Sequence, residues 1–226
     1  ADEYTAFLYP LFSQLSIRFE DVDMAIVSSV VPDANFNISR FCDQVLGCDV
    51  MHVTPETVSI PINLKKPEEV GADRLVNAVA VVHEYQVPCI VIDFGTATTF
   101  DVVDAGGGYA GGIIAPGVNL SVSALNQAAA RLPKISLRRP EKVIGKDTVS
   151  AMQSGIYWGY TAMIEGLLER MVREMEEPQH YVIATGGLAN LFAPAIPAID
   201  KVDEELTLKG LFRIYEEHKN LNKDAA

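Results

Sequence analysis

The sequence predicts an α/β fold with a mixed sheet, on three observations. Short apolar runs rich in β-branched residues alternate along the chain with segments of helical periodicity, the pattern of an α/β protein. Two runs in the middle, 98–103 and 109–115, are joined by a glycine-rich turn, which predicts an antiparallel hairpin inside that alternation. With 226 residues, of which 49% are hydrophobic and 21% charged, the composition is that of a folded globular protein.

The first 70 residues predict two helices and two strands. A β-branched run of strand length, 24–31, is closed by Pro32. Apolar residues recur at helical spacing over 35–46, and Gly47 supplies a C-terminal stop signal. The other elements expected here are a helix over 3–15, a strand over 49–53 and a polar loop over 61–69.

The rest of the chain alternates more regularly. A helix starts at residues 71–74 and places Leu75, Val79 and Val82 on one face. The longest predicted helix, 148–174, has apolar residues spaced by three or four. The remaining elements are strands over 89–94 and 181–184, the hairpin described above, a helix over 119–132 and a last helix near 205–217.

Charge and cysteine usage limit the possible functions. The net charge of −12 repels phosphodiester backbones and argues against nucleic-acid binding. Three cysteines without a C-x-x-C pair fit a reduced protein with free thiols rather than a disulfide scaffold. No apolar run approaches the ~18 residues of a membrane helix, and no signal peptide opens the sequence. We therefore expect a soluble, cytoplasmic protein without membrane partners.

Two motif matches fail their structural context. Residues 106–111 satisfy G-x-G-x-x-G, but β-like residues follow them, so a hairpin turn is favoured over a dinucleotide site. Residues 145–148 resemble the end of a phosphate-binding P-loop, but Pro140 replaces its upstream glycine.

The strongest chemical signal is the segment DFGTATT, residues 93–99, directly after an apolar strand. Asp93 can hold a cation, Gly95 lets the backbone approach a phosphate, and Thr96 offers a hydroxyl and an N–H. The alternative is a plain β-turn in which Asp93 caps its own backbone.

Two further segments suggest ligand contacts. At 71–74, Asp73 lies at a predicted helix start, where a negative charge is stabilised, and Arg74 offers a fork for a carboxylate or phosphate. The alternative there is a surface charge pair. Gly186 and Gly187 follow a strand and allow flat contact with a nucleotide, or only a tight turn. The four histidines are scattered singly and show no metal-ligand spacing.

Taken together and in this order, these segments resemble the type III pantothenate kinases of the acetate and sugar kinase/Hsp70/actin superfamily. The segments that carry the resemblance span essentially the whole chain and are ADEY (1–4), VSSVVP (27–32), EVGADRLVNAVA (69–80), DFGTATTFDV (93–102), GGIIAPG (111–117), AMQSG (151–155) and IATGGLA (183–189).

The resemblance implies two ribonuclease-H-like halves of the actin-like ATPase type, which we place at 1–86 and 87–226, with ATP between them. It implies transfer of the γ-phosphoryl of ATP to the primary hydroxyl of pantothenate, the first step toward coenzyme A. It also implies K⁺ or NH₄⁺ and Mg²⁺ as cofactors and a cytoplasmic homodimer.

The resemblance also implies roles for individual residues. Asp73 is similar to the general base, and Asp93 to the ligand of the monovalent cation. The expected pantothenate contacts are Gly71, Ala72, Asp73, Arg74 and Thr148. The expected ATP contacts are Gly95, Thr96, Gly186 and Gly187, the two last by a looser match.

Two features depart from the family pattern. Leu64 stands nine residues before Asp73, where the family usually places a substrate-contacting Tyr. The first phosphate loop, of the form D-x-G-N-T, and its N-terminal hairpin have no counterpart here, so we expect a truncated chain that uses ATP poorly.

Two rival functions remain open at this point. The family includes Bvg accessory factors, named for a role in transcription, so a non-catalytic regulator of the same fold is one alternative. Retention of Asp73, Arg74, Asp93 and Thr96 argues for chemistry instead. A superfamily kinase for a sugar or acetate is the other alternative, and the GADR and AMQSG segments count against it.

Overall fold

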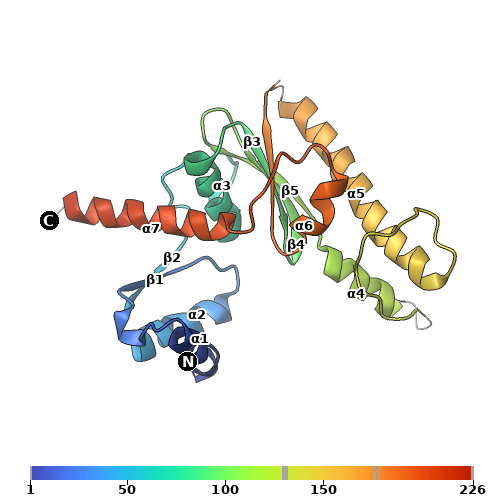
Figure 1. The fold of residues 1–226 in the computed structure, drawn as a ribbon. Helices are drawn as coiled ribbons and strands as arrows, with labels where there is room; N and C mark the ends of the chain where they lie inside the picture. The colour runs from blue at the N-terminus through green and yellow to red at the C-terminus, as the bar shows by residue number, and fades with distance from the viewer. Residues whose placement is uncertain (1, 129–131, 176, 178, 225–226) are drawn as a thin grey trace. The chain divides into compact units, whose positions relative to one another are not determined.

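A computed structural model of the protein describes residues 2–128, 132–175, 177 and 179–224. The chain forms two compact units (Figure 1). Unit 1 contains the residues up to 83 together with those from 207 onward, and unit 2 contains residues 84–206. Each unit is a set of residues that contact one another more than they contact the rest of the chain. The predicted boundary at residue 87 concerns two ribonuclease-H-like halves, and it stays a prediction.

Unit 2 is built on one five-stranded sheet of order β5-β4-β3-β6-β7. Its central strand β3 pairs antiparallel with β4 and parallel with β6, so the sheet is mixed, as the sequence predicts. The strands are β3 (Cys89–Phe94), β4 (Ala97–Val103), β5 (Tyr109–Pro116), β6 (Tyr181–Thr185) and β7 (Lys201–Val202).

One face of this sheet carries the core of unit 2. The long helix α5 (Thr148–Met175) contributes an apolar stripe to it, and Figure 1 shows α5 beside the sheet. Phe192 lies at the centre, because its ring stacks on Phe94 at 5.3 Å and on Tyr157 at 5.2 Å between centroids. The other helices of this unit are α4 (Val118–Ala128), α6 (Ala189–Phe192) and a 3₁₀ turn at Ala193–Ala195.

Unit 1 contains a two-stranded parallel sheet of β1 (Met24–Val27) and β2 (Asp49–His52). An aromatic cluster of Tyr4, Phe12, Phe19 and Phe41 joins its N-terminal helices. These helices are α1 (Asp2–Gln14) and α2 (Pro32–Phe41), the latter extended by a π-helical turn at Cys42–Leu46. The unit also contains α3 (Ala72–Glu84), α7 (Leu206–Asp224) and 3₁₀ turns at Phe19–Asp21 and Pro67–Glu69.

The C-terminal helix α7 belongs to unit 1 because it packs closely on α3. Gly210 lies so near that an added Cβ would be 2.1 Å from the carbonyl oxygen of Val76. One turn earlier, the Thr207 hydroxyl donates to Asn77 Oδ1 at 2.8 Å.

Several predicted element boundaries are wrong. The strand predicted over 24–31 ends at Val27, because the Ser29 hydroxyl hydrogen-bonds the backbone of Val31 and competes with strand pairing. The next helix starts at Pro32, since proline suits the first helical position. The last helix continues to Asp224. Part of the helix predicted over 119–132 lies outside the described residues.

In the part of the chain that the structure describes, no helix has both the length and the apolar character needed to cross a bilayer.

Candidate functional site

The segment predicted to bind phosphate lies where β3 turns into β4. Asp93 is half-buried near the end of β3, and Gly95 and Thr96 form the exposed turn. The Gly95 N–H donates to the carbonyl of Ala97 at 3.1 Å, which closes the turn tightly. The structure therefore places Asp93, Gly95 and Thr96 together at one end of the sheet.

The glycine pair after β6 lies beside the same turn. β6 is the parallel neighbour of β3, and Asp93 is directly opposite Thr185. Gly186 has a φ of +87°, and a Cβ added there would lie 2.6 Å from Asp93 Oδ1 and 2.8 Å from the backbone of Phe94. Gly186 thus leaves space for the Asp93 carboxylate.

A cavity of about 430 Å³ opens at this place. Gly187 lines it together with Gly95 and Thr96. A Cβ on Gly187 would meet no atom within 4 Å, and one on Gly95 would make only ordinary contacts of 3.5 Å or more. Packing within the protein does not require glycine at these two positions. A ligand that lies flat against the backbone would require glycine there, as in nucleotide-binding turns.

The first two turns of α4 also line this cavity. Asn119 and Ser123 line it, one helical turn apart. Gly117 lets the start of α4 lie close to the turn at Gly95 and Thr96, here called the phosphate turn. A Cβ on Gly117 would lie 2.0 Å from the carbonyl oxygen of Thr96. Sequence reasoning did not assign these residues. Gly117 ends the GGIIAPG segment, which has no polar side chain, and Asn119 and Ser123 lie outside that segment.

The GADR segment lies in unit 1, at the start of α3. Asp73 is exposed in the first turn, and its Oδ1 accepts the N–H of Arg74 at 2.9 Å. An added Cβ on Gly71 would lie 2.6 Å from the same oxygen, so the carboxylate folds back over Gly71. Ala72 is buried and anchors the turn, and Arg74 is half-buried. The predicted helix start is confirmed.

Thr148 lies in unit 2, exposed at the first position of α5. A capping box starts this helix: Asp147 Oδ1 accepts the N–H of Ser150 at 2.9 Å, and Ser150 Oγ accepts the N–H of Asp147 at 3.1 Å. The Ser150 N–H, followed by the Ser150 hydroxyl that donates to Asp147 Oδ2 at 2.8 Å, holds the pKa of the Asp147 carboxyl below its usual value. The geometry fixes the backbone around Thr148 and leaves its hydroxyl accessible.

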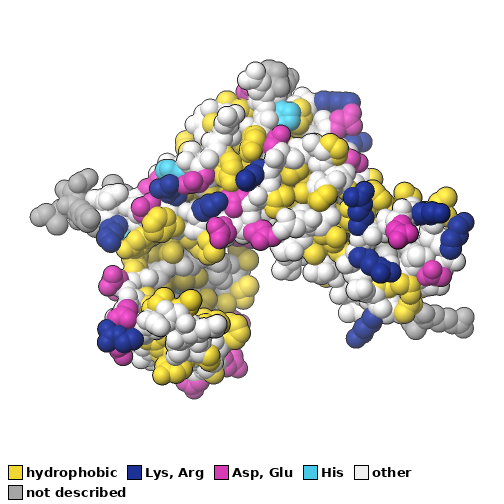
Figure 2. All heavy atoms as spheres, in the orientation of Figure 1, with side chains coloured by type: hydrophobic (Ala, Val, Ile, Leu, Met, Phe, Trp, Pro, Cys, Tyr) yellow, Lys and Arg dark blue, Asp and Glu magenta, His cyan; other side chains and the backbone are white. Residues whose placement is uncertain are grey.

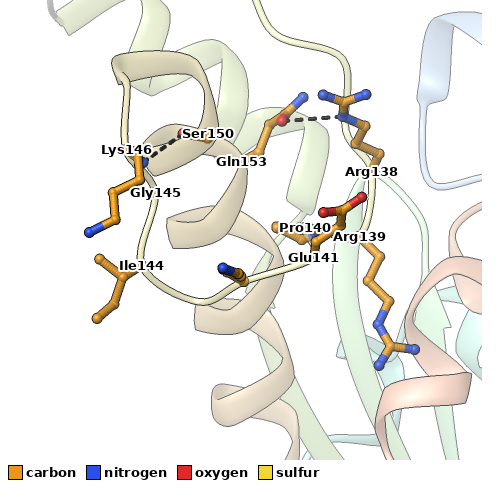
Figure 3. Close-up of a pocket in the computed structure, with 10 residues that line it drawn as sticks. Arg138, Arg139, Pro140, Glu141, Ile144, Gly145, Lys146, Ser150 and Gln153 are labelled. Atoms are coloured by element: carbon orange, nitrogen blue, oxygen red, sulfur yellow. Dashed lines mark hydrogen bonds between the residues drawn. The ribbon is translucent and has the colours of Figure 1, made fainter.

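Next to Thr148, the loop before α5 is strongly cationic. Residues 132–146 contain five Lys or Arg and one Glu, in a chain whose net charge is −12. This loop and the start of α5 border a pocket of about 470 Å³ (Figure 3), where Arg138 Nε donates to Gln153 Oε1 at 3.3 Å. Figure 2 shows Lys and Arg gathered over this end of unit 2. The local charge favours anionic ligands.

Leu64, at the position where the family pattern has Tyr, is half-buried in the loop before α3. An apolar side chain there offers no hydrogen bond to a ligand.

The donors around Asp93 are oxygens, which suit hard cations. A carboxylate, threonine hydroxyls and backbone carbonyls are oxygen ligands of the kind such ions take. Among the described residues, no group of three or more His, Cys, Asp or Glu is arranged to hold a metal ion. A Mg²⁺ ion that arrives with ATP takes several ligands from phosphate and water.

A mixed α/β sheet whose central strand ends in a carboxylate and an open glycine turn defines a protein suited to phosphorylated ligands. Comparison with known proteins agrees. The sequence profile of the type III pantothenate kinases matches residues 1–170. The chain belongs to the type III pantothenate kinase family.

Individual relatives support this assignment. A type III pantothenate kinase of Phenylobacterium zucineum is 49% identical over 216 residues, which are 95% of this chain and 84% of the relative. That of Rhodospirillum rubrum is 51% identical over 217 residues, with the same coverage of both chains.

One solved structure confirms the fold. A Campylobacter jejuni protein assigned to the Baf family of transcriptional activators superimposes with a TM-score of 0.60, covering 93% of this chain and 89% of its own. At 18% identity, this similarity concerns the fold alone.

Proposed function

We propose that this protein transfers the γ-phosphoryl group of ATP to the primary hydroxyl of pantothenate, with Asp73 as the general base. Its family phosphorylates pantothenate in coenzyme A biosynthesis. The observation that carries the residue assignment is the geometry of Asp73, a solvent-facing carboxylate held in one orientation at a helix start.

Asp73 suits proton abstraction because its two oxygens differ. Oδ1 is occupied by the N–H of Arg74 and lies against Gly71. Oδ2 then accepts the proton of the pantothenate hydroxyl as that oxygen attacks the γ-phosphorus. In phosphoryl transfer the protein acts mainly by positioning and by neutralising charge, so a fixed carboxylate is sufficient.

The acceptor is held by the rest of the predicted pantothenate set. The guanidinium of Arg74 pairs with the pantothenate carboxylate, since a planar fork matches a carboxylate in two hydrogen bonds. Gly71 and Ala72 present backbone to the substrate, and the Thr148 hydroxyl donates a further bond. The cationic loop 132–146 raises the local concentration of this anion in an otherwise acidic protein.

The proposed contacts of the nucleotide all lie in unit 2. Gly95 and Thr96 contact its phosphates with backbone N–H groups and one hydroxyl, and Gly186 and Gly187 allow its close approach. Asp93 holds K⁺ or NH₄⁺ beside the phosphates. With the Mg²⁺ that accompanies ATP, such an ion would supply positive charge near the phosphates.

We further propose a cytoplasmic homodimer with no nucleic-acid partner. The resemblance supports the dimer and the compartment, and the net charge of −12 supports the absence of nucleic-acid contact.

The test compares Asp73→Asn with Asp33→Asn in the protein as its gene encodes it. Asp33 is an exposed first-turn aspartate of α2, so it controls for the charge change. We expect Asp73→Asn to lower kcat by roughly 10²–10⁴-fold, the usual contribution of a general base, and to leave the KM for ATP nearly unchanged.

The assay follows ATP consumption with pantothenate, acetate and a hexose offered separately. Turnover of Asp73→Asn at the parent rate would exclude Asp73 as the base. Consumption with acetate or hexose alone would exclude pantothenate as the acceptor. No consumption with any acceptor would favour the non-catalytic regulator.

A further inference from the structure

A fully buried carboxylate in β4 has no part in the proposed reaction. Asp101 is 0% exposed. Its Oδ1 accepts the hydroxyl of Tyr109 at 2.8 Å, and its Oδ2 accepts the hydroxyl of Thr99 at 3.0 Å. Removing a carboxylate from water is costly even when it is hydrogen-bonded, so a hydrophobic residue would serve packing alone better. The two bonds of Asp101 instead fix the hydroxyl protons of its partners.

The sheet register places Thr99 next to Asp93. Thr99 is directly opposite Asp93 across the β3–β4 pair, and Thr185 is directly opposite Asp93 on the β6 side. Side chains of directly paired residues share a face of the sheet, with Cβ atoms about 4.5–5.5 Å apart. Asp101, two residues after Thr99, points to that face too. Asp93 is thus flanked by two threonines, one of them bonded to Asp101.

The bond to Asp101 decides what Thr99 can offer a ligand. A threonine hydroxyl has one proton and two lone pairs, whereas an ionised carboxylate only accepts. The single proton of Thr99 is directed to Asp101 Oδ2. Toward the Asp93 side, Thr99 Oγ1 therefore presents lone pairs, which attract a cation, and no proton, which would repel it.

We propose that Asp101 is a positioning residue for the monovalent cation at Asp93. It accepts the hydrogen bond of the Thr99 hydroxyl, and so leaves the lone pairs of that oxygen free to bind the cation. This inference rests on the role proposed for Asp93 and adds Thr99 as a second oxygen of the same site. In this proposal Asp101 acts through Thr99 and is not itself a ligand of the cation.

The experiment measures cation binding without catalysis. Thermal unfolding of the nucleotide-free protein is followed across a KCl series at constant ionic strength, balanced with choline chloride. The K⁺ concentration that gives half of the maximal stabilisation reports the affinity of the site, since a ligand that binds only the folded state raises the Tm.

Four variants separate positioning from packing. Asp101→Asn preserves shape, but its amide N–H₂ donates to Thr99 and turns the Thr99 proton outward. Thr99→Val removes the hydroxyl, and Thr99→Ser restores it. Tyr109→Phe removes the other bond to Asp101 and is the control for lost stability alone.

We expect Asp101→Asn and Thr99→Val to raise the half-saturating K⁺ concentration about tenfold, the effect of one hydrogen-bond-scale interaction with a charge. Thr99→Ser should keep the parent value. Tyr109→Phe should lower the Tm in every buffer and also keep the parent K⁺ dependence. If Asp101→Asn does not fold, the Thr99→Val and Thr99→Ser pair decides.

Three results would overturn the inference: an unaltered protein that K⁺ does not stabilise, unchanged K⁺ dependence in Thr99→Val, or an equal shift in Tyr109→Phe. The pantothenate assay of the unaltered protein separates this outcome from the function. Phosphorylation with unchanged K⁺ dependence in the variants rejects only the role of Asp101. The expected K⁺ shifts without phosphorylation reject only the kinase assignment.

Discussion

Glycines around the phosphate turn fall into two groups that a sequence motif does not distinguish. Gly186 has a positive φ, and a Cβ added there would lie 2.6–2.8 Å from atoms of Asp93 and Phe94. The fold itself therefore requires glycine at this position. Gly187 is adjacent in the chain, yet its Cβ position is empty and faces the cavity. The fold itself therefore accounts for Gly186, whereas at Gly187 only the proposed contact with ATP calls for a missing side chain.

This difference gives a matched pair of substitutions. Gly186→Ala should reduce the free energy of unfolding by about 2 kcal/mol or more, because strain at positive φ adds to the clash with Phe94. Gly187→Ala should change it by less than about 0.5 kcal/mol and raise the KM for ATP. Denaturant titration and steady-state kinetics measure both quantities. Gly187→Ala with the parent KM would place the nucleotide elsewhere.

Residues whose role depends on a local motif could be predicted, and those that depend on packing could not. Asp93 and Asp73 were located correctly at a strand end and a helix start, because turn and helix-start signals are local. Gly117 was missed as a site residue because its contact with Thr96 joins segments that are separated by strands β4 and β5. Asp101 was given no role, because it is connected to the site only through its bond to Thr99 and through the register that pairs Thr99 with Asp93.

At the scale of elements, the ends of unit 2 are joined by a tyrosine–aspartate bond. Tyr85, just before β3, donates to Asp203, just after β7, at 2.6 Å. Asp203 is 7% exposed, and Tyr85 also stacks on Tyr181. Burial, with the neighbouring carboxylate second, raises the Tyr85 pKa well above its usual value.

Tyr85→Phe should therefore cost about 1.5–3 kcal/mol of unfolding free energy at pH 7, as loss of a hydrogen bond to a charged group does. The pH dependence has a definite sign. Because the folded pKa is raised, the contribution of Tyr85 is complete below about pH 10 and declines as the pH rises beyond it. Urea titrations at pH 7 and above 10 test this, and parallel alkaline losses in parent and variant would contradict it.

Element type was easier to predict than element extent. The hairpin and α5 follow from strong alternation and long apolar periodicity, and both are confirmed. β7 was missed because two residues are too few for any period. α7 was predicted too short, since the pattern of its last two turns is largely polar.

At the scale of the whole molecule, the three free cysteines report on the integrity of both units. Cys89 is fully buried in the central strand, and desolvation raises the pKa of its thiol to about 12. Cys42 is buried in unit 1, and its thiol pKa is raised for the same reason. Cys48 is half-buried and borders a cavity of that unit.

We expect a thiol reagent at pH 8 to modify Cys48 in the native protein and to reach Cys42 and Cys89 only through unfolding, because the thiolate is the reactive form. Absorbance of the released chromophore gives the rates, and peptide mass analysis identifies the sites. Equal native rates at all three cysteines would show that the regions around Cys42 and Cys89 open readily. A chaotrope-treated sample provides the fully reactive reference.

The placement of β3 also matters during protein synthesis. Its partner β4 follows after a two-residue turn, whereas Asp93 pairs with Thr185, roughly 90 residues later. A ribosome adds about 5–20 residues per second, so the nascent β3–β4–β5 hairpins wait several seconds for β6. Throughout that interval, the most apolar strand of the sheet has one unpaired edge open to other chains. Expression at lower temperature or with a chaperone that shields nascent strands should therefore raise the soluble yield.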